Sequence, residues 1–394
     1  MSMIKRIIEG EAENYLAGKT TKILFIWGPR RSGKTILLGE IARRHGVRVF
    51  NFDLLSDREK FAGDKTQLEK LAREEKIILI DEVQNGPEAT VGLKILHDLF
   101  GAKIIATGSS ELRQKGSGEF DSLAGRFMER YCLPLSAAEA VTAAGRKSYE
   151  EKQVYKRFQE AGQIFGGYPE VYDTNLDEKS KIELLKNIVE TYVLKDVVNI
   201  YELKNVKLAR DILIKIGLQL GSEVSIREIA GTVSASVPTV ASYIEIYIKN
   251  YVLISLPSFK TNLRRAVSEN RKLYFYDLGI RNALVEDFRG LELRPDRGGL
   301  WENFVIAEME KRRRNENMLM NMYFYREYGG REVDLVLEDY HKNYGCIEMK
   351  RKGAAARPVF PLEHSLKVVN PDNYQELLAA KEQDLFRVAE DRGI

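Results

Sequence analysis

A glycine-rich segment near the N-terminus has the residues and the spacing needed to bind phosphate. It fits the pattern G-x-x-x-x-G-K-[ST] in full and lies between an apolar run, KILFIW, and a segment with helical spacing, TILLGEIARRHG. The glycines let backbone N–H groups curl around a phosphate, and the helix start adds the positive end of its dipole. The lysine would reach the β- and γ-phosphates, and the threonine hydroxyl would ligate Mg²⁺. The residues expected to bind nucleotide are Gly28, Pro29, Arg30, Arg31, Ser32, Gly33, Lys34, Thr35 and Ile36.

Polar residues that follow the next apolar runs could supply hydrolytic chemistry. Asp81 and Glu82 end the run IILI, and Ser109 follows the run KIIATG. An aspartate in this position holds Mg²⁺ through water, and a glutamate beside it polarises the attacking water. We expect Lys34, Glu82 and Ser109 to act in catalysis, with the serine as a polar sensor between the glutamate and the γ-phosphate. Thr35 and Asp81 would hold the metal.

A second set of charged residues, near the C-terminus, suits metal-assisted cleavage of phosphodiesters. Glu348 and Lys350 lie on one face of a strand because side chains alternate with period two, and Asp334 lies in a neighbouring strand. Glu302 is on the preceding helix. We expect Glu302, Asp334 and Glu348 to bind Mg²⁺ or Mn²⁺. Lys350 would act in catalysis beside the scissile phosphate.

The order of these residues resembles the PD-(D/E)xK nuclease superfamily, which has a helix glutamate, a hairpin aspartate and then E-x-K on the next strand. The chain departs from that pattern after Lys350, where RKGAAARPVFPLEHSLKVV is short and contains two prolines in place of a full helix. The alternative is a nuclease-like fold kept for binding DNA or protein, in which the charges form structural ion pairs.

Short apolar strands alternating with helices predict an α/β fold with a parallel sheet that is covered on both faces. The chain then turns mostly helical, and from residue 222 the order helix, turn, helix and two extended segments is typical of a winged helix. We expect four domains: a P-loop ATPase domain over 1–150, a helical lid over 151–220, a winged-helix domain over 221–290 and a nuclease-like α/β domain over 291–394.

The second helix of the winged-helix segment, PTVASYIEIYIKN, is poor in positive charge. Lys249 is its only basic residue, and Glu245 opposes contacts with phosphate. Basic residues around the following extended segments compensate in part, and these are Lys260, Arg264, Arg265, Arg271 and Lys272. DNA is therefore the expected partner of this domain, with a protein partner as the alternative. The basic tract KRRR at 311–314 is interpreted as a solvated helix end.

Composition limits the classes of function. The 61 basic and 58 acidic side chains give a net charge of +3, so DNA contacts would have to come from local patches. The two cysteines, Cys132 and Cys346, exclude a disulfide framework and a thiolate zinc site. The N-terminal residues lack the apolar stretch of a signal peptide, and no run approaches the roughly 20 apolar residues of a membrane span. We expect a cytoplasmic protein that does not enter a membrane.

Several motifs together resemble the AAA-type ATPases of archaea and bacteria that carry a C-terminal domain of uncharacterised role: GPRRSGKT, IILIDEVQ, IATGSSELR, DSLAGRF, LPLSAAE, GGYPEVY and TYVLKDV. The resemblance covers most of the chain and implies the metal, water and sensor roles given above to Asp81, Glu82 and Ser109. The GGYP turn resembles the glycine–proline motif of related signal-transduction ATPases, which implies that Pro169 lines the adenine pocket, with a turn between lid helices as the alternative. Arg126, in SLAGR, is a candidate arginine finger from a neighbouring subunit or domain, which would imply a homo-oligomer; the alternative is an arginine on a solvated face.

These features predict a protein that binds ATP with Mg²⁺ and hydrolyses it. ATP bound between the sheet domain and the helical lid would set the orientation of the winged-helix and nuclease-like domains, and hydrolysis at Glu82 would reset it. The alternative is an ATP-dependent regulatory or scaffolding protein whose C-terminal domain binds partners and cuts nothing. A protein remodeller is disfavoured because the sequence has no aromatic pore loop for gripping peptides.

Overall fold

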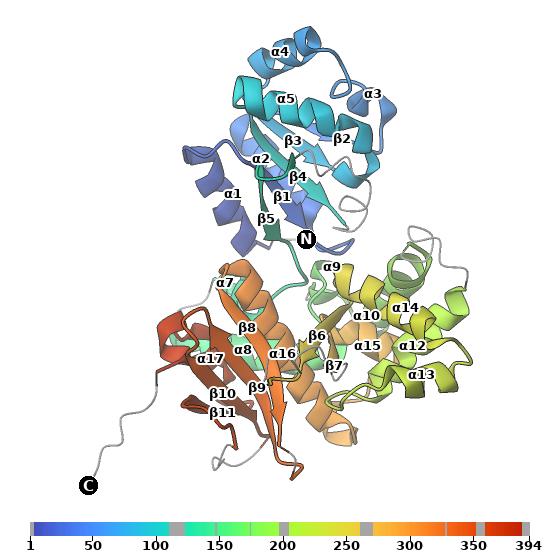
Figure 1. The fold of residues 1–394 in the computed structure, drawn as a ribbon. Helices are drawn as coiled ribbons and strands as arrows, with labels where there is room; N and C mark the ends of the chain where they lie inside the picture. The colour runs from blue at the N-terminus through green and yellow to red at the C-terminus, as the bar shows by residue number, and fades with distance from the viewer. Residues whose placement is uncertain are drawn as a thin grey trace. The chain divides into compact units, whose positions relative to one another are not determined.

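The chain forms two compact units, and each has its own hydrophobic core (Figure 1). The computed structural model describes residues 4–109, 123–145, 148–173, 175–196, 205–260, 271–327, 329–351 and 359–387. The first unit consists of Met1–Leu135 and Lys249–Tyr251, and the second of Ser136–Ile248 and Val252–Ile394.

The first unit is built on a five-stranded parallel sheet in the strand order β2-β3-β4-β1-β5. The strands are β1 (Ile23–Trp27), β2 (Val49–Asn51), β3 (Ile77–Asp81), β4 (Lys103–Gly108) and β5 (Phe127–Tyr131). The helices are α1 (Ile7–Ala17), α2 (Lys34–His45), α3 (Leu55–Arg58), α4 (Lys65–Glu74), α5 (Thr90–Phe100) and the 3-10 helices η1 (Val83–Asn85) and η2 (Pro87–Ala89). The predicted α/β fold with a parallel sheet is confirmed.

The central strands of this sheet are apolar along most of their length because helices cover both faces. Every residue of β1 is buried, and α1 and α2 pack on one face through Ile8, Leu37 and Ile41. Helices α4 and α5 lie on the other face (Figure 1). Since the strands are parallel, their carboxyl ends meet at one edge of the sheet, and the segments that follow β1, β3 and β4 converge there.

The second unit begins with a region of helices and one two-stranded antiparallel sheet. Its helices are α7 (Ala137–Ala144), α8 (Ser148–Phe165), α9 (Pro169–Tyr172), α10 (Glu178–Ile188), the π-helix η4 (Val189–Asp196), α12 (Val206–Leu218), α13 (Ile226–Thr232), α14 (Val237–Lys249) and α15 (Leu278–Val285). The two strands are β6 (Leu253–Pro257) and β7 (Arg271–Phe275). Helix α7 belongs to this unit, although the predicted first domain, 1–150, includes it.

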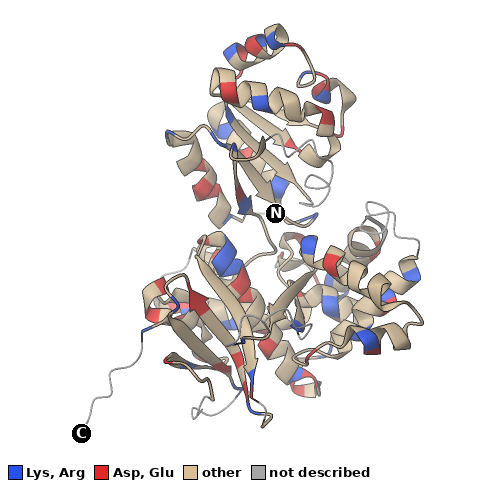
Figure 2. Ribbon diagram, viewed as in Figure 1, with Lys and Arg blue, Asp and Glu red and all other residues tan. Residues whose placement is uncertain are grey.

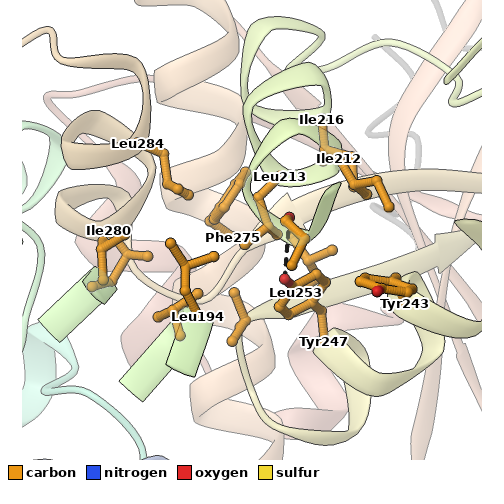
Figure 3. Close-up of a cluster of buried hydrophobic side chains, with 14 of the residues drawn as sticks. Leu194, Ile212, Leu213, Ile216, Tyr243, Tyr247, Leu253, Phe275, Ile280 and Leu284 are labelled. Carbon is orange, nitrogen blue, oxygen red and sulfur yellow. Dashed lines mark hydrogen bonds between the residues drawn. The ribbon is translucent and has the colours of Figure 1, made fainter. Parts of the chain in front are cut away.

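One hydrophobic core joins these helices across residue 220, where the sequence prediction separates a lid from a winged helix (Figure 3). Leu213 of α12 is fully buried in this core together with Tyr247 of α14 and Phe275 of β7. The Tyr247 hydroxyl donates a hydrogen bond to the Ala209 carbonyl oxygen at 3.1 Å, so α14 is also tied to α12 by a polar contact. The shared core indicates that this region folds as one body, and the division into four domains stays a prediction.

The region predicted as a winged helix contains the expected elements in the expected order. Helix α13 begins after Ser225, whose side chain accepts a hydrogen bond from the Glu228 N–H as an N-cap does. Helix α14 follows, and strands β6 and β7 pair in the register Leu253↔Phe275. The assignment of this region as a winged helix stays a prediction.

The last part of the second unit is a four-stranded sheet in the order β11-β10-β9-β8, which follows helix α16 (Arg297–Asn315) along the chain. Strand β9 pairs antiparallel with β8 and β10, whereas β10 and β11 are parallel. The strands are β8 (Met320–Arg326), β9 (Glu332–Asp339), β10 (Tyr344–Met349) and β11 (Ser365–Val369). The remaining short helices are η6 (Leu291–Leu293), α17 (Tyr374–Ala379) and η7 (Glu382–Leu385). A further sheet domain at the C-terminal end is therefore confirmed.

Basic and acidic residues are interspersed along the ribbon of both units (Figure 2). In the described parts of the chain, none of the helices combines the length and the apolar character that crossing a bilayer requires.

The common core predicts that α10, α12 and α14 unfold together. Leu213→Ala should lower the free energy of unfolding by about 2–5 kcal/mol, because it opens a cavity in this core. Leu218→Ala is a matched control on the same helix, since Leu218 is 62% exposed, and it should change stability by no more than about 0.5 kcal/mol. Amide hydrogen exchange is the measurement: Leu213→Ala should accelerate exchange in peptides of α10 and α14 alike. Faster exchange in α10 alone would show two separately folding modules.

Candidate nucleotide site and carboxylate cluster

The predicted phosphate loop lies between β1 and α2, at the carboxyl edge of the parallel sheet. Lys34 is buried, and its Nζ donates hydrogen bonds to the carbonyl oxygens of Gly28 at 2.9 Å and Pro29 at 2.8 Å. Burial lowers the pKa of Lys34, and the neighbouring carboxylates of Glu82 and Asp81 act in the opposite direction. The loop thus holds the ammonium against neutral oxygen atoms at the start of a helix, where an anion is favoured.

The shape of the loop depends on its two glycines. A Cβ on Gly28 would lie 1.9 Å from the Cys132 carbonyl oxygen, so any side chain there would displace backbone. Gly33 has φ 100°, a conformation that favours glycine. Arg31 also has a positive φ, 63°, which is uncommon for a residue with a side chain. These requirements explain why glycine stands at both positions of the motif.

A buried arginine supports the loop from beneath, and the sequence analysis missed it. The Arg6 guanidinium donates to the Ser32 carbonyl oxygen and, at 2.6 Å, to the Leu133 carbonyl oxygen. It also lies 3.4 Å from the Cys132 sulfur. No local motif marks Arg6, because its partners Ser32 and Leu133 stand 26 and 127 residues further along the chain.

The threonine of the loop contacts the aspartate that ends β3. The Thr35 hydroxyl donates to Asp81 Oδ2 at 2.7 Å, and the Thr107 hydroxyl donates to Asp81 Oδ1. The carboxylate is therefore held by one hydroxyl on each oxygen, facing the start of α2. A hydroxyl and a carboxylate oxygen in contact are a donor set that suits Mg²⁺, which accepts few protein ligands and keeps several waters.

Glu82 has a strained backbone and a side chain fixed by a glutamine. Its φ of 54° lies in the left-handed region, which costs about 1–3 kcal/mol for a residue other than glycine. Its carboxylate accepts a hydrogen bond from Gln84 Nε2, and Gln84 Oε1 accepts one from the Ser109 N–H at 3.3 Å. Gln84 therefore connects the expected base to the expected sensor. The sequence analysis gave Gln84 no role, although its place in the DEVQ motif was a usable signal.

Two buried hydroxyl groups at this edge of the sheet fit a bound phosphate. Ser32 Oγ and Ser109 Oγ are both buried, and neither has a hydrogen-bond partner among the described residues. A buried polar atom without a partner costs about 1–3 kcal/mol, so its retention calls for a ligand. Together with the glycine cradle and the Thr35–Asp81 contact, these hydroxyls indicate that the residues present fit a nucleotide with its metal.

Arg126 precedes β5 and lies at the amino ends of the parallel strands, whereas the phosphate loop lies at their carboxyl ends. Its carbonyl oxygen accepts a hydrogen bond from the Ile23 N–H at the start of β1, roughly 16 Å from the end of that strand. Its guanidinium pairs with Asp98 at 2.8 Å, and this pairing lowers the pKa of Asp98 to about 2. Arg126 is therefore too far to reach the loop of its own chain. Its role as a finger toward another copy stays a prediction.

Pro169 and Ile36 are the remaining predicted nucleotide contacts. Ile36 lies in the first turn of α2 and is exposed, whereas Pro169 opens α9 in the second unit. The GGYP turn is built around the buried carboxylate of Asp277, because the Gly167 N–H donates to Asp277 Oδ2 at 2.7 Å and a Cβ on Gly166 would lie 1.9 Å from Oδ1. These contacts account for the motif as a turn between helices, and the adenine role of Pro169 stays a prediction.

The predicted residues of the C-terminal site lie on adjacent strands. Asp334 of β9 and Glu348 of β10 are opposite one another by the register that pairs Leu335 with Ile347. Asp334 Oδ2 accepts a hydrogen bond from the Met349 N–H at 2.6 Å. Lys350 pairs with Glu348 at 2.9 Å, and this hydrogen bond raises the pKa of the lysine.

Two further residues, Glu332 and Lys272, complete this site. Ligand oxygens of Glu302, Glu332 and Asp334 lie within 4.8 Å of one another. Lys272 Nζ lies 2.9 Å from Glu302 Oε1 and also contacts Glu332 Oε1, and its side chain is 1% exposed. The Tyr274 hydroxyl donates to the same Glu302 oxygen at 2.6 Å. We call Glu302, Glu332, Asp334 and Glu348 the carboxylate cluster.

The sequence analysis missed both additions for different reasons. Glu332 stands two residues before Asp334 and shares its face of the strand, so the same period-two rule could have found it. The prediction for Lys272 was wrong: it was expected to contact DNA phosphate, but it is buried and paired with carboxylates. No signal in the sequence placed it there.

The carboxylate cluster is crowded with negative charge. The pKa of Asp334 is raised to about 7, first by burial and then by the neighbouring charges of Glu302 and Glu348, against the hydrogen bond from Met349 and the charge of Lys272. Burial alone would lower the pKa of Lys272, but Glu302 and Glu332 raise it above its ordinary value. The ammonium of Lys272 is thus held firmly in its charged form among the carboxylates.

Other basic residues expected to contact DNA are also engaged. Arg271 pairs with Glu245 at 2.6 Å. Arg264 and Arg265 lie outside the described residues. The KRRR tract is not a solvated helix end, because Lys311 and Arg312 are buried, with Lys311 paired to Glu308 at 2.9 Å. The structure therefore leaves fewer basic side chains for phosphate than the sequence suggested.

Three families match successive parts of the chain. Residues 20–141 match the AAA domain. This match supports an AAA-type P-loop domain in that segment. Residues 159–293 match a domain of unknown function, DUF8612, and residues 297–379 match another, DUF4143. The first of these two matches spans the shared core that runs across residue 220.

Two curated relatives come from the archaeon Methanocaldococcus jannaschii, and both are described as uncharacterised proteins. One is 28% identical over 89% of this chain and 80% of its own length. The other is 22% identical over 71% of this chain and 65% of its own length. Neither name assigns an activity.

Solved structures with partial likeness include the Orc1 protein of Aeropyrum pernix in complex with DNA, at 14% identity and a TM-score of 0.32 over 71% of this chain and 91% of that one. The RuvB Holliday junction branch migration motor of Thermotoga maritima gives 14% identity and a TM-score of 0.30 over 64% of this chain and 88% of that one. These scores are too low to bear on what this chain binds.

The crowding of charge predicts that Asp334→Asn stabilises the protein at high pH. Because the pKa of Asp334 is raised above its unfolded value, the folded chain binds more protons between about pH 4 and pH 7, and stability falls as pH rises through that window. Asp334→Asn should therefore increase the free energy of unfolding at pH 8 by on the order of 1–3 kcal/mol, which raises the melting temperature. At pH 4 it should give little gain.

Asp339→Asn, on the same strand, is the matched control. Partial burial raises the pKa of Asp339, but hydrogen bonds from Asn343 and His341 lower it overall, so this substitution should not stabilise. Thermal unfolding at both pH values measures the difference. An equal gain from both variants at pH 8 would contradict the crowding of Asp334.

Proposed function

We propose that the N-terminal AAA-type domain binds ATP with Mg²⁺ and hydrolyses it, and that this activity controls the helical and C-terminal regions of the chain. The hydrogen bond of 2.7 Å between Thr35 and Asp81 carries the proposal, because it joins the phosphate loop to the carboxyl end of β3. Glu82 follows directly, with its carboxylate oriented by Gln84. These are the residue types that nucleotide hydrolysis requires, in a shared location.

Different residues of the chain would bind the phosphates, hold the metal and activate water. Lys34 supplies positive charge to the phosphates, and the backbone N–H groups of the loop bind them. Mg²⁺, held by Thr35 and Asp81, would neutralise charge on the phosphates. Glu82 would take a proton from water, and Gln84 donates a hydrogen bond to its carboxylate while accepting one from the Ser109 N–H.

Glu82→Gln should retain ATP binding and lose turnover by roughly 10²–10⁴-fold, because the amide cannot accept the proton of the attacking water. Glu88→Gln is the matched control: it makes the same change to an exposed carboxylate on η2 and should leave turnover unchanged. Phosphate release measures turnover, and titration with a fluorescent ATP analogue measures binding. Turnover that survives in Glu82→Gln would show that this residue is not the base.

DNA is the proposed effector of this ATPase. Arg227 of α13 and Lys249 of α14 are exposed, so cations remain on both helices of the predicted winged helix. Duplex DNA added to the same assay should raise turnover at low salt and lose its effect as the salt concentration rises, because phosphate contacts are salt-dependent. Turnover that DNA leaves unchanged would favour a protein partner and a regulatory or scaffolding role.

The C-terminal region offers two candidate functions. Asp334, Glu348 and Lys350 on neighbouring strands favour metal-dependent cleavage of DNA, and the buried ammonium of Lys272 favours a domain that binds partners without cutting. The residues of the carboxylate cluster do not fit a divalent ion in this arrangement, because Lys272 already contacts Glu302 and Glu332. We therefore propose the binding role.

Nicking of supercoiled plasmid in Mg²⁺ or Mn²⁺ tests this choice. The wild-type chain should nick no faster than Lys350→Ala, since Lys272 contacts Glu302 and Glu332 where a metal would have to bind. Metal-dependent nicking by the wild type that Lys350→Ala abolishes would contradict the binding role and support a nuclease.

A further inference from the structure

Lys272 lies on strand β7, and its side chain contacts carboxylates that belong to another part of the chain. Strand β7 lies in the segment 159–293, whereas the carboxylates come from α16, β9 and β10 in the segment 297–379. The lysine side chain is 1% exposed, so it has left water almost completely. An ammonium in that position requires counter-charges, and the two nearest are Glu302 and Glu332.

The position of the ammonium conflicts with a divalent ion. A metal held by Glu302, Glu332 and Asp334 would lie within about 2.0–2.6 Å of their oxygens. Lys272 Nζ is hydrogen-bonded to one oxygen of each glutamate, so it already lies where such an ion would bind. The two cations would repel each other strongly in a site with little water.

The remaining carboxylates of the cluster also have partners within the chain. Glu348 pairs with Lys350 at 2.9 Å, and Glu332 pairs on its other oxygen with Arg326 at 2.7 Å. Asp334 accepts the Met349 N–H. A cation or an N–H donor of the protein therefore contacts each of the four carboxylates without a metal.

We propose that Lys272 is the resident cation of the carboxylate cluster: it takes the place of a divalent metal and fastens strand β7 to the C-terminal sheet. The cluster is thereby closed to metal for as long as β7 keeps this position. This proposal is independent of the ATPase activity, since no residue of the phosphate loop takes part.

Binding of Mn²⁺ to the full chain, without nucleotide, tests the proposal, with free Mn²⁺ followed by electron paramagnetic resonance. The wild type should show no Mn²⁺ binding that depends on the cluster, so Glu302→Gln should leave its titration unchanged. Lys272→Met keeps most of the unbranched side chain and removes the charged end, and it should gain a site that binds Mn²⁺ roughly tenfold tighter or more. Adding Glu302→Gln to Lys272→Met should remove the gained site.

Arg271→Met is the matched control, because Arg271 is the neighbouring cation on β7, points to the opposite face of the strand and pairs with Glu245. It should gain no Mn²⁺ site. Thermal unfolding gives a second readout: Mn²⁺ should raise the melting temperature of Lys272→Met and leave that of the wild type unchanged.

Two results would overturn the proposal. The first is a Mn²⁺ site in the wild type that Glu302→Gln removes, a result that needs no change at Lys272 and so stands even if Lys272→Met does not fold. The second is a folded Lys272→Met that binds Mn²⁺ no better than the wild type. Neither result would affect the ATPase proposal, which is tested by phosphate release.

Discussion

A charged side chain that is buried away from water needs hydrogen-bond partners or counter-charges within the protein, and this constraint shapes both candidate sites. In the first unit, the buried Lys34 donates to the neutral carbonyl oxygens of Gly28 and Pro29. In the second unit, the buried Lys272 contacts the carboxylates of Glu302 and Glu332. Carbonyl oxygens satisfy the hydrogen bonds of a lysine and leave its charge available to an anion. Carboxylates satisfy the hydrogen bonds of a lysine and also neutralise its charge. The charge of Lys34 is therefore available to an anion, whereas that of Lys272 is not.

The same constraint explains where the second unit begins. Glu308 of α16 is buried, pairs with Lys311, and accepts a hydrogen bond from the Ala137 N–H at 2.7 Å. That bond ties the first turn of α7 to α16, so α7 belongs to the second unit despite its place in the predicted first domain. The carboxylate of Asp277 acts in a similar way, because it accepts N–H groups from the turn after α8 and from the start of α15. Buried acids thus fasten elements that are distant in sequence.

The parts of the structure that the sequence could predict are those whose determinants are local. The phosphate loop is readable because its residues are contiguous and two of them must be glycine, and the pairing of Asp334 with Glu348 follows from the alternation of two adjacent strands. The shared core was not predictable, because helical periodicity shows which face of a helix is buried but not which helix covers it.

Lys272 was out of reach for the same reason. Its partners stand 30 and 60 residues further along the chain, and in sequence it only extends a run of basic residues. A basic residue beside a basic loop reads as a phosphate contact, and only the tertiary packing of β7 against the C-terminal sheet shows that it is buried.

Strain and unmet hydrogen bonds separate the two sites further. Natural sequences break local rules mainly where function requires it. At the nucleotide site, Glu82 holds a left-handed backbone, and Ser32 and Ser109 keep buried hydroxyls without partners among the described residues. These groups lower stability unless a ligand uses them. In the carboxylate cluster, each of the four carboxylates finds a cation or an N–H group within the chain. The first site therefore keeps groups that the proposed nucleotide could use, whereas in the second every carboxylate already has a partner within the chain.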